Sequence, residues 1–200
     1  MLIMLVSVPF GSTTAAAAQD SWFTDVEQGK WYYESVKYVF DNGLMVGTTD
    51  TEFSPDENFS RAMLVTVLWR VEGEPEYNTI DFADVRHSKW YTKAISWAAT
   101  NGIVAGIGNG RFAPNDPVTR EQMASIFKRY ADYLKLDPSA RADVDAFNDR
   151  AKISKWAKTS MKWAIGAKLI FGVGSNNLDP QGNATRAQSA AILERFCKQI

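Results

Sequence analysis

The chain has 200 residues, of which 46% are hydrophobic and 22% are charged, so it is long and apolar enough to bury a core. Its formal net charge of −1 excludes a global field that would attract nucleic acid or an anionic membrane, and any anion site has to be local. The single cysteine, Cys197, excludes an internal disulfide. With only one histidine, His87, the chain also lacks the ligands for a metal site built on Cys and His.

Residues 1–18 read as an export signal. An apolar run over residues 1–10 leads into small residues, and the alanines before Gln19 fit an A-x-A cleavage site. The run is too short to hold a protein in a bilayer, and no later stretch is apolar enough to cross one. We therefore expect a secreted protein with no membrane contact once the signal is removed.

Five short motifs then occur three times in the same order. They are F-x-D at Phe23, Phe82 and Phe147; K-W ending at Trp31, Trp90 and Trp156; a glycine closing an apolar run at Gly47, Gly106 and Gly172; F/L-x-P at Phe53, Phe112 and Leu178; and S/T-R at Arg61, Arg120 and Arg186. The first two copies of both the tryptophan and the arginine are 59 residues apart, and the third follows after 66 residues. The chain is therefore three copies of one unit, at 23–73, 82–134 and 147–200.

Each unit reads as helix, loop, helix. In the second unit apolar residues recur at helical spacing from Trp90 until Asn101-Gly102 ends the helix, and a Gly/Pro-rich stretch follows. Thr119 then opens a second helix, with Gln122 placed to complete a capping box. Because a two-helix unit with one apolar face must bury it against its siblings, we predict an all-α fold in which the three repeats close into a pseudo-threefold body.

A solenoid of tetratricopeptide type is the rival architecture. Its repeats are about 34 residues long and have tightly linked helices. The repeats here are far longer, and a Gly/Pro loop separates their helices. These differences exclude the solenoid.

The order F-x-D-V, W, N-G-x-x-x-G, F-x-P and T-R-x-x resembles the S-layer homology family over residues 23–200. The resemblance implies a cell-wall anchoring module of bacterial surface proteins, in which the second helices of three repeats form a central bundle. It also implies that grooves between neighbouring repeats bind an anionic secondary cell-wall polysaccharide, often a pyruvylated one. The family's main contact with the acidic sugar is the arginine that matches Arg61, Arg120 and Arg186.

Two departures from the family pattern matter. The glutamate that follows T-R-A in the family is replaced by Met63, Gln122 and Gln188. Glutamine still closes a capping box and methionine does not, so the helix start of the first unit should be weaker by about 1 kcal/mol or less. The third unit lacks the Asn-Gly stop, so its groove is the one of the three that we least expect to follow the family pattern.

The repeated arginines have two interpretations. A cation in the first helical turn opposes the helix dipole, so helix stability alone does not favour it. Beside free backbone N–H groups it makes an anion site, because guanidinium binds a carboxylate through two parallel hydrogen bonds. The alternative is a salt bridge to an acidic side chain of the neighbouring repeat. The residues leave both open, and the resemblance favours ligand contact.

The loops between the helices are further candidates for sugar contact. Their glycines, Gly47, Gly106 and Gly172, would let the backbone approach a ligand closely. The polar side chains that follow, Asp50, Asn109 and Asn176, would bond to sugar hydroxyls. Plain turns between helices explain the same residue types equally well.

The tryptophans are the last candidates. Trp31, Trp90 and Trp156 each offer a face for a sugar ring and an indole N–H. Their helical spacing with Ala94 and Trp97 in the second unit favours a place in the core instead.

Catalysis has no support in the sequence. No nucleophile motif, dinucleotide-binding glycine fingerprint, P-loop or calcium loop is present, so we predict neither an enzyme nor a cofactor. We expect a secreted module that holds itself noncovalently to an anionic polysaccharide of a bacterial cell wall, with up to three grooves acting together. The alternatives are a module that self-associates or binds partners in a surface layer, its arginines bridging repeats, and the anchoring part of a larger enzyme.

Overall fold

The computed structural model describes residues 22–200, so the predicted export signal lies outside the described residues. The described chain forms α1 (Tyr33–Asp41), α2 (Arg61–Val71), α3 (Thr92–Thr100), α4 (Arg120–Tyr133), α5 (Lys158–Gly166) and α6 (Arg186–Cys197), with 3-10 turns η1 (Arg150–Lys152) and η2 (Lys155–Ala157). Over this range there is no β-strand, only isolated bridges, which confirms the all-α prediction. No helix in it is long and apolar enough to cross a membrane.

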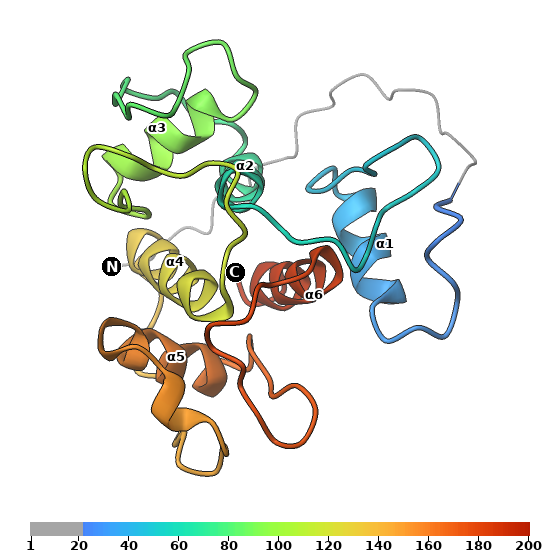
Figure 1. The fold of residues 1–200 in the computed structure, drawn as a ribbon. Coiled ribbons are helices and arrows are strands. Elements are labelled where there is room, and N and C mark those ends of the chain that lie inside the picture. The colour runs from blue at the N-terminus through green and yellow to red at the C-terminus, as the bar shows by residue number, and fades with distance from the viewer. Residues whose placement is uncertain (1–21) are drawn as a thin grey trace, which may run out of the picture.

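The helices pair between repeats rather than within them. α1 packs against α6, α3 against α2, and α5 against α4, so the first helix of each repeat lies on the second helix of the preceding one. Figure 1 shows α2, α4 and α6 around the centre, with α1, α3 and α5 further out. This is the predicted pseudo-threefold body with a central bundle, and the pairing means that no repeat buries its apolar faces by itself.

One apolar core runs through all three repeats. Its largest fully buried side chains include Phe53, Phe59, Leu64, Leu68, Trp97, Phe112, Phe127 and Tyr130. In the bundle, Phe196 of α6 lies 5.1 Å from Phe127 and 5.2 Å from Tyr130 of α4, measured between ring centroids. Burying a side chain of this size contributes about 2 kcal/mol, so the contacts between α4 and α6 stabilise the junction of two repeats.

A ring of three backbone hydrogen bonds lies at the start of the bundle. The N–H of Phe59 donates to the carbonyl of Ala184, that of Val118 to Phe59, and that of Ala184 to Val118, each over 2.9 Å. All three residues are buried, and each belongs to a different repeat. Since each repeat both gives and receives one bond, the segments before α2, α4 and α6 close into a cycle.

The second helices begin where the sequence predicts. The hydroxyls of Ser60, Thr119 and Thr185 accept the backbone N–H three residues on, and all three residues are extended, as N-caps require. Gln122 and Gln188 return the bond to their caps, and Met63 does not. The predicted difference in capping-box hydrogen bonds is therefore confirmed, and its effect on stability stays a prediction.

The first helices end as expected in two repeats. Asn42 and Asn101 donate side-chain hydrogen bonds of 2.8 and 2.9 Å to helix carbonyls, and the glycine after each is left-handed. In the third repeat Lys168 takes that conformation, with φ of 57°. A left-handed residue with a β-carbon costs about 1 kcal/mol, so this turn is formed against local preference.

The missing capping box gives a stability prediction. Met63→Gln should raise the free energy of unfolding by about 0.5 kcal/mol, because it supplies an acceptor for the backbone N–H of Ser60. The matched control, Gln122→Met, removes the same bond from α4 and should lower it by a similar amount. Urea denaturation of both variants measures the effect, and a less stable Met63→Gln would contradict it.

Candidate functional site

The arginines that open the second helices reach into the next repeat. Nε of Arg61 donates to the carbonyl of Phe112 over 2.9 Å, and its Nη2 donates to that of Ala105 over 3.2 Å. Arg120 makes the same pair of bonds to Leu178 and Phe171, over 2.7 and 2.6 Å. Arg186 closes the cycle onto the first repeat, through Phe53 and Val46, both over 2.7 Å. The three buried side chains therefore bridge the repeats.

The bridge differs from the salt bridge that the sequence suggested, and ligand contact by these arginines stays a prediction. Its acceptors are backbone carbonyls, whereas the sequence suggested an acidic side chain. The helix N–H groups are not free either: those of Arg61 and Ala62 donate to the carbonyls of Asp116 and Pro114, and equivalent bonds occur at α4 and α6. The expectation of free amides beside the arginine is therefore wrong, because the neighbouring repeat fills the helix end.

Carboxylates stand near each guanidinium without bonding to it. Burial lowers the pKa of all three arginines, and Asp116 beside Arg61 and Asp179 beside Arg120 oppose that shift. An arginine remains charged even so. Each bridge therefore places a fixed positive charge between two repeats.

The same loop segment is held from its own repeat by an aspartate. Both carboxylate oxygens of Asp84, in the second F-x-D motif, accept backbone N–H groups, from Phe112 and Ala113, over 2.8 Å each. Asp25 and Asp149 do the same in the other repeats. Sequence reasoning missed this role, although the threefold recurrence of the aspartate signalled it.

We call the two hydrogen bonds to each of these aspartates the aspartate clamp. It holds strained backbone in place. The middle residue of each F/L-x-P motif is left-handed without being glycine: Ser54 and Ala113 at φ of 58° and Asp179 at 47°. Such a residue persists only where its surroundings determine its conformation. The aspartate and the arginine supply that determination from opposite sides.

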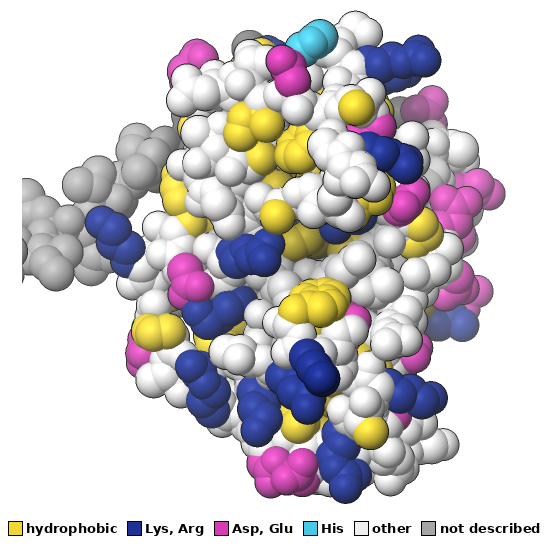
Figure 2. Space-filling model, turned by 60° about the vertical axis from the view of Figure 1, so that its left-hand side comes forward, with side chains coloured by type: hydrophobic (Ala, Val, Ile, Leu, Met, Phe, Trp, Pro, Cys, Tyr) yellow, Lys and Arg dark blue, Asp and Glu magenta, His cyan; other side chains and the backbone are white. Residues whose placement is uncertain are grey.

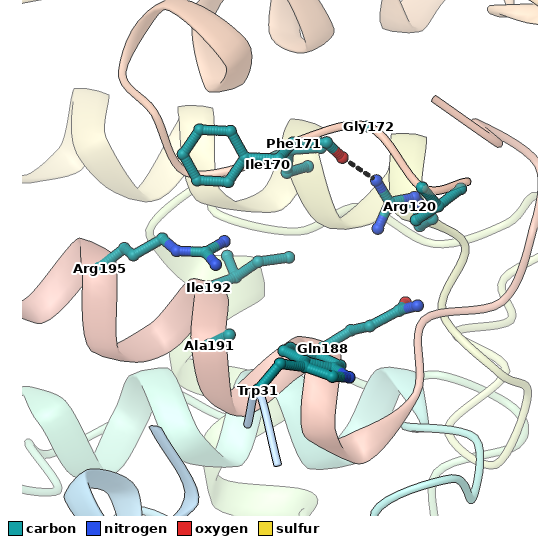
Figure 3. A pocket seen from close by; sticks show the side chains of 10 residues that line it. Trp31, Arg120, Ile170, Phe171, Gly172, Gln188, Ala191, Ile192 and Arg195 are labelled. Carbon is teal, nitrogen blue, oxygen red and sulfur yellow. Dashed lines mark hydrogen bonds between the residues drawn. The ribbon is translucent and has the colours of Figure 1, made fainter. Parts of the chain in front are cut away.

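A groove of about 320 Å³ lies beside Arg120. Figure 3 shows Arg120 above it, the loop at Ile170, Phe171 and Gly172 along the top, and α6 below with Trp31 beside it. Nε and Nη2 of Arg120 donate to the carbonyls of Leu178 and Phe171. Its Nη1 has no hydrogen-bond partner in the described chain and faces the groove. This groove is the one lined by the third repeat, which therefore forms it despite its altered motifs.

A second guanidinium faces Arg120 across the groove. Nη1 of Arg195 donates to the carbonyl of Leu169 over 3.0 Å, and its guanidinium carbon lies 4.6 Å from the centroid of the Phe171 ring. Arg70 and Arg129 occupy the same position in α2 and α4. These residues were missed in the sequence, although each follows the S/T-R arginine by nine residues.

The tryptophans are exposed, so the expectation that they lie in the core is wrong. Trp31, Trp90 and Trp156 are 63%, 57% and 59% exposed. α1 and α3 begin only two residues after the tryptophan, so the helical spacing does not extend back to it, and the next residue turns inward instead. Trp31 lines the groove of Arg120, and the repeat offsets place Trp90 and Trp156 beside Arg186 and Arg61.

The loop glycines serve close packing. A β-carbon on Gly47 would stand 2.3 Å from the carbonyl oxygen of Thr49 and 2.6 Å from the ring of Phe23. Gly106 and Gly172 face the equivalent phenylalanines. Asp50, Asn109 and Asn176 are exposed on these loops, and none of them lines the groove of Arg120. Sugar contact by these six residues stays a prediction.

The three repeats differ at one position of the second helix. Where α6 has Ala191, the repeat offsets give Thr66 in α2 and Ser125 in α4. Both hydroxyls are buried without a hydrogen-bond partner among the described residues. An unsatisfied buried hydroxyl is unfavourable. The second helices of the first two repeats therefore carry a buried polar group that α6 lacks.

Comparison with known proteins decides the family. A family model described as "S-layer homology domain" (SLH) matches residues 23–62, 81–124 and 146–190, which is most of the chain. The chain belongs to the S-layer homology family. SLH repeats are found in S-layer proteins and surface enzymes of bacteria, which they attach to the cell wall.

The relatives include both surface-layer proteins and enzymes. The chain is 32% identical over 201 residues to an endoglucanase of Bacillus sp. (strain KSM-635), covering all of this chain and 21% of that enzyme. It is 29% identical over 189 residues to the surface-layer 125 kDa protein of Lysinibacillus sphaericus, covering 93% and 16%. It is 26% identical over 200 residues to an S-layer protein of Bacillus anthracis, covering 98% and 24%. The SLH region thus matches about a fifth of each relative, and most of the endoglucanase lies outside it.

The aspartate clamp of the second SLH repeat gives a pH-dependent prediction. Burial disfavours the charged form of Asp84, but the N–H groups of Phe112 and Ala113 outweigh it and hold the pKa below the ordinary 3.8. A carboxyl with a depressed folded pKa stabilises the fold above its unfolded pKa, and this contribution is lost as the pH falls through the folded pKa. Asp84→Asn should therefore lower the free energy of unfolding by about 1–3 kcal/mol at pH 7, and by less below about pH 3.

Chemical denaturation across this pH range tests the clamp. Asp50→Asn is the matched control, because Asp50 is exposed and bonds to nothing described, and it should leave stability unchanged. An equal loss for Asp84→Asn at pH 7 and at acid pH would contradict the account.

Proposed function

We propose that this chain holds a bacterial surface protein to the cell wall by binding an anionic, pyruvylated polysaccharide in the grooves between its SLH repeats. The observation that carries the proposal is the pair Arg120 and Arg195, which face each other across a groove edged by the exposed Trp31. The chain would act outside the cell, as a binding module without catalysis or cofactor.

The groove suits a sugar that carries a carboxylate. A carboxylate between Arg120 and Arg195 would accept charge-assisted hydrogen bonds from both guanidinium groups. Trp31 offers an aromatic face to the sugar ring, and the Gln188 amide can pair with a hydroxyl. A bound anion would also relieve the repulsion between the two cations.

The bridging role of the arginine supports binding rather than competing with it. Two carbonyls fix the guanidinium of Arg120, so it loses little freedom when a ligand arrives. A guanidinium has five N–H donors, and Nη1 is still available. One side chain can therefore join the repeats and present a donor to the groove.

Three grooves on one body favour firm retention from weak sites. A polymer held in one groove is presented to the others at high effective concentration. The hydroxyls of Thr66 and Ser125 would make two of these grooves differ from that of Arg120, so we expect unequal affinities.

The tryptophans give a cleaner test than the arginines. Arg120→Ala removes the donors to two carbonyls and should lower the free energy of unfolding by about 1–3 kcal/mol. A loss of binding in this variant could therefore come from a less stable fold. The triple variant of Trp31, Trp90 and Trp156 to Ala removes exposed side chains and should change stability by less than about 0.5 kcal/mol. We predict that it loses at least about tenfold in affinity for cell walls, a loss of about 1.4 kcal/mol.

Co-sedimentation with purified walls measures this, before and after the secondary polymer is stripped. Wild-type protein should bind the intact walls and not the stripped ones. Ile200→Ala, which removes an exposed apolar side chain outside the groove, is the control and should bind like the wild type. Equal binding of wild-type protein to both wall preparations would refute the proposal and favour a protein partner.

A further inference from the structure

Charge is strongly segregated along the nearly neutral chain. Residues 23–81 hold 12 acidic and 4 basic side chains, whereas residues 141–200 hold 5 acidic and 10 basic ones. Figure 2 shows Lys and Arg side chains gathered on the lower part of the molecule, where α5 lies in Figure 1. A uniform anchoring repeat has no need of this difference.

The cations of the third repeat include an exposed group that lies outside the groove of Arg120. We call it the α5 basic surface, made of Arg150, Lys152, Lys155, Lys158 and Lys162. Among the described residues none of its four lysine Nζ atoms has a carboxylate within 4.0 Å, and only Arg150 is paired, with Asp145 at 3.5 Å. Some lysines elsewhere have a partner one helical turn away, as Lys37 has Asp41 and Lys128 has Asp132, and the described lysines without one are not gathered in a group of four. The four lysines of the α5 basic surface are therefore uncompensated.

The arrangement disfavours α5 as a helix. Lys158 and Lys162 stand one turn apart, where like charges repel, and Lys158 occupies the positive end of the helix dipole. The equivalent positions are Tyr33 and Lys37 in α1, and Thr92 and Ser96 in α3, by the repeat offsets. Since the other repeats fold without this cluster, the fold does not require it.

The cations surround a hollow of about 380 Å³. It is lined by Val144, Ala151 and Ile153, by the cations Arg150, Lys158 and Lys162, and by one carboxylate, that of Asp145, which pairs with Arg150. An apolar lining with cations around it suits a sugar ring that bears an anionic group. A hollow of this volume favours a sugar ring as the ligand over the flat surface of a protein partner.

From the uncompensated charge and the hollow together, we propose that the α5 basic surface is a second binding site for the anionic wall polymer, separate from the grooves. Its ligand is a glycan with repeated carboxylate or phosphate groups. Lys158 and Lys162 lie about 6 Å apart along the helix axis, so they present repeated charges to a chain rather than to one residue. The choice of wall polymer as ligand rests on the proposed function.

The neighbouring groove lies close enough for one polymer to reach both. Lys155 and Trp156 belong to η2, which packs against α4. Ser154, just before them, donates hydrogen bonds of 2.9 and 2.7 Å from its N–H and hydroxyl to Glu121. By the repeat offsets, Trp156 and α4 border the groove of Arg61, so the α5 basic surface begins beside that groove. A polysaccharide chain leaving the groove would pass onto this surface.

The other candidate for this surface is the acidic first repeat of a second copy. Several of its carboxylates are already engaged, such as Glu27 with Lys30 and Asp41 with Lys37. Asp25 forms the aspartate clamp of the first repeat. We therefore favour the polymer, and head-to-tail association is an outcome that the test distinguishes.

The test compares two double variants that lose the same charge. Lys158→Gln with Lys162→Gln removes part of the α5 basic surface, and Lys93→Gln with Lys135→Gln removes exposed lysines elsewhere. Binding of purified polymer is titrated at several salt concentrations. We expect the first variant to bind about tenfold more weakly at low salt, with a slope of log K against log salt smaller by about one per lysine. The control should match the wild type, and thermal unfolding should show both variants folded.

The outcomes separate this proposal from the proposed function. Unchanged binding by Lys158→Gln with Lys162→Gln overturns the second site, while the tryptophan variant reports on the grooves independently. Loss of binding in the lysine variant but not in the tryptophan variant supports the second site and refutes the grooves. Phosphate-bearing and pyruvylated polymers, used side by side, identify the anion. Sedimentation velocity at low salt measures whether two copies associate. If the mass of the wild-type protein rises, the lysine variant abolishes that rise, and the same variant binds polymer like the wild type, then the surface binds a second copy and the proposal is overturned.

Discussion

A single peptide segment, the F/L-x-P motif, is the point through which each repeat is joined to the one before it. In the second repeat Asp84 accepts the N–H groups of Phe112 and Ala113, and Arg61 of the first repeat donates to the carbonyl of Phe112. The backbone between these bonds is left-handed without glycine, so it depends on both partners. Because Arg186 of the last repeat holds Phe53 of the first, the joints form a closed ring and no repeat is complete alone.

The ring also builds the groove in which we propose that the ligand binds. Each arginine is fixed by carbonyls of the next repeat, and in the groove of Arg120 a second arginine, Arg195 of α6, faces it. The groove between two repeats therefore exists only in the assembled body, and its charge is positioned before any ligand arrives. Trp31, which has no part in the core, is free to contact that ligand.

The sequence predicts the fold well because the motifs recur with constant spacing. Three copies of a capped second helix determine the all-α class and the helix starts at Arg61, Arg120 and Arg186, and the central bundle is what the family resemblance implied. The partners of these arginines were not predictable, since backbone carbonyls leave no mark in a sequence. Trp31 was assigned to the core because the pattern did not show that α1 begins only at Tyr33. Arg195 was missed because its importance appears only when α6 faces the loop at Phe171.

In the proposed function, the arginine pair recognises a carboxylate that belongs to the ligand and not to the protein. The most direct measurement is calorimetric titration of the wild-type chain with purified wall polymer, before and after mild acid removes its ketal-linked carboxylates. If the arginine pairs recognise that group, binding to the treated polymer should fall by at least about a hundredfold, which corresponds to about 2.7 kcal/mol. Equal affinity for the two polymers would contradict the account.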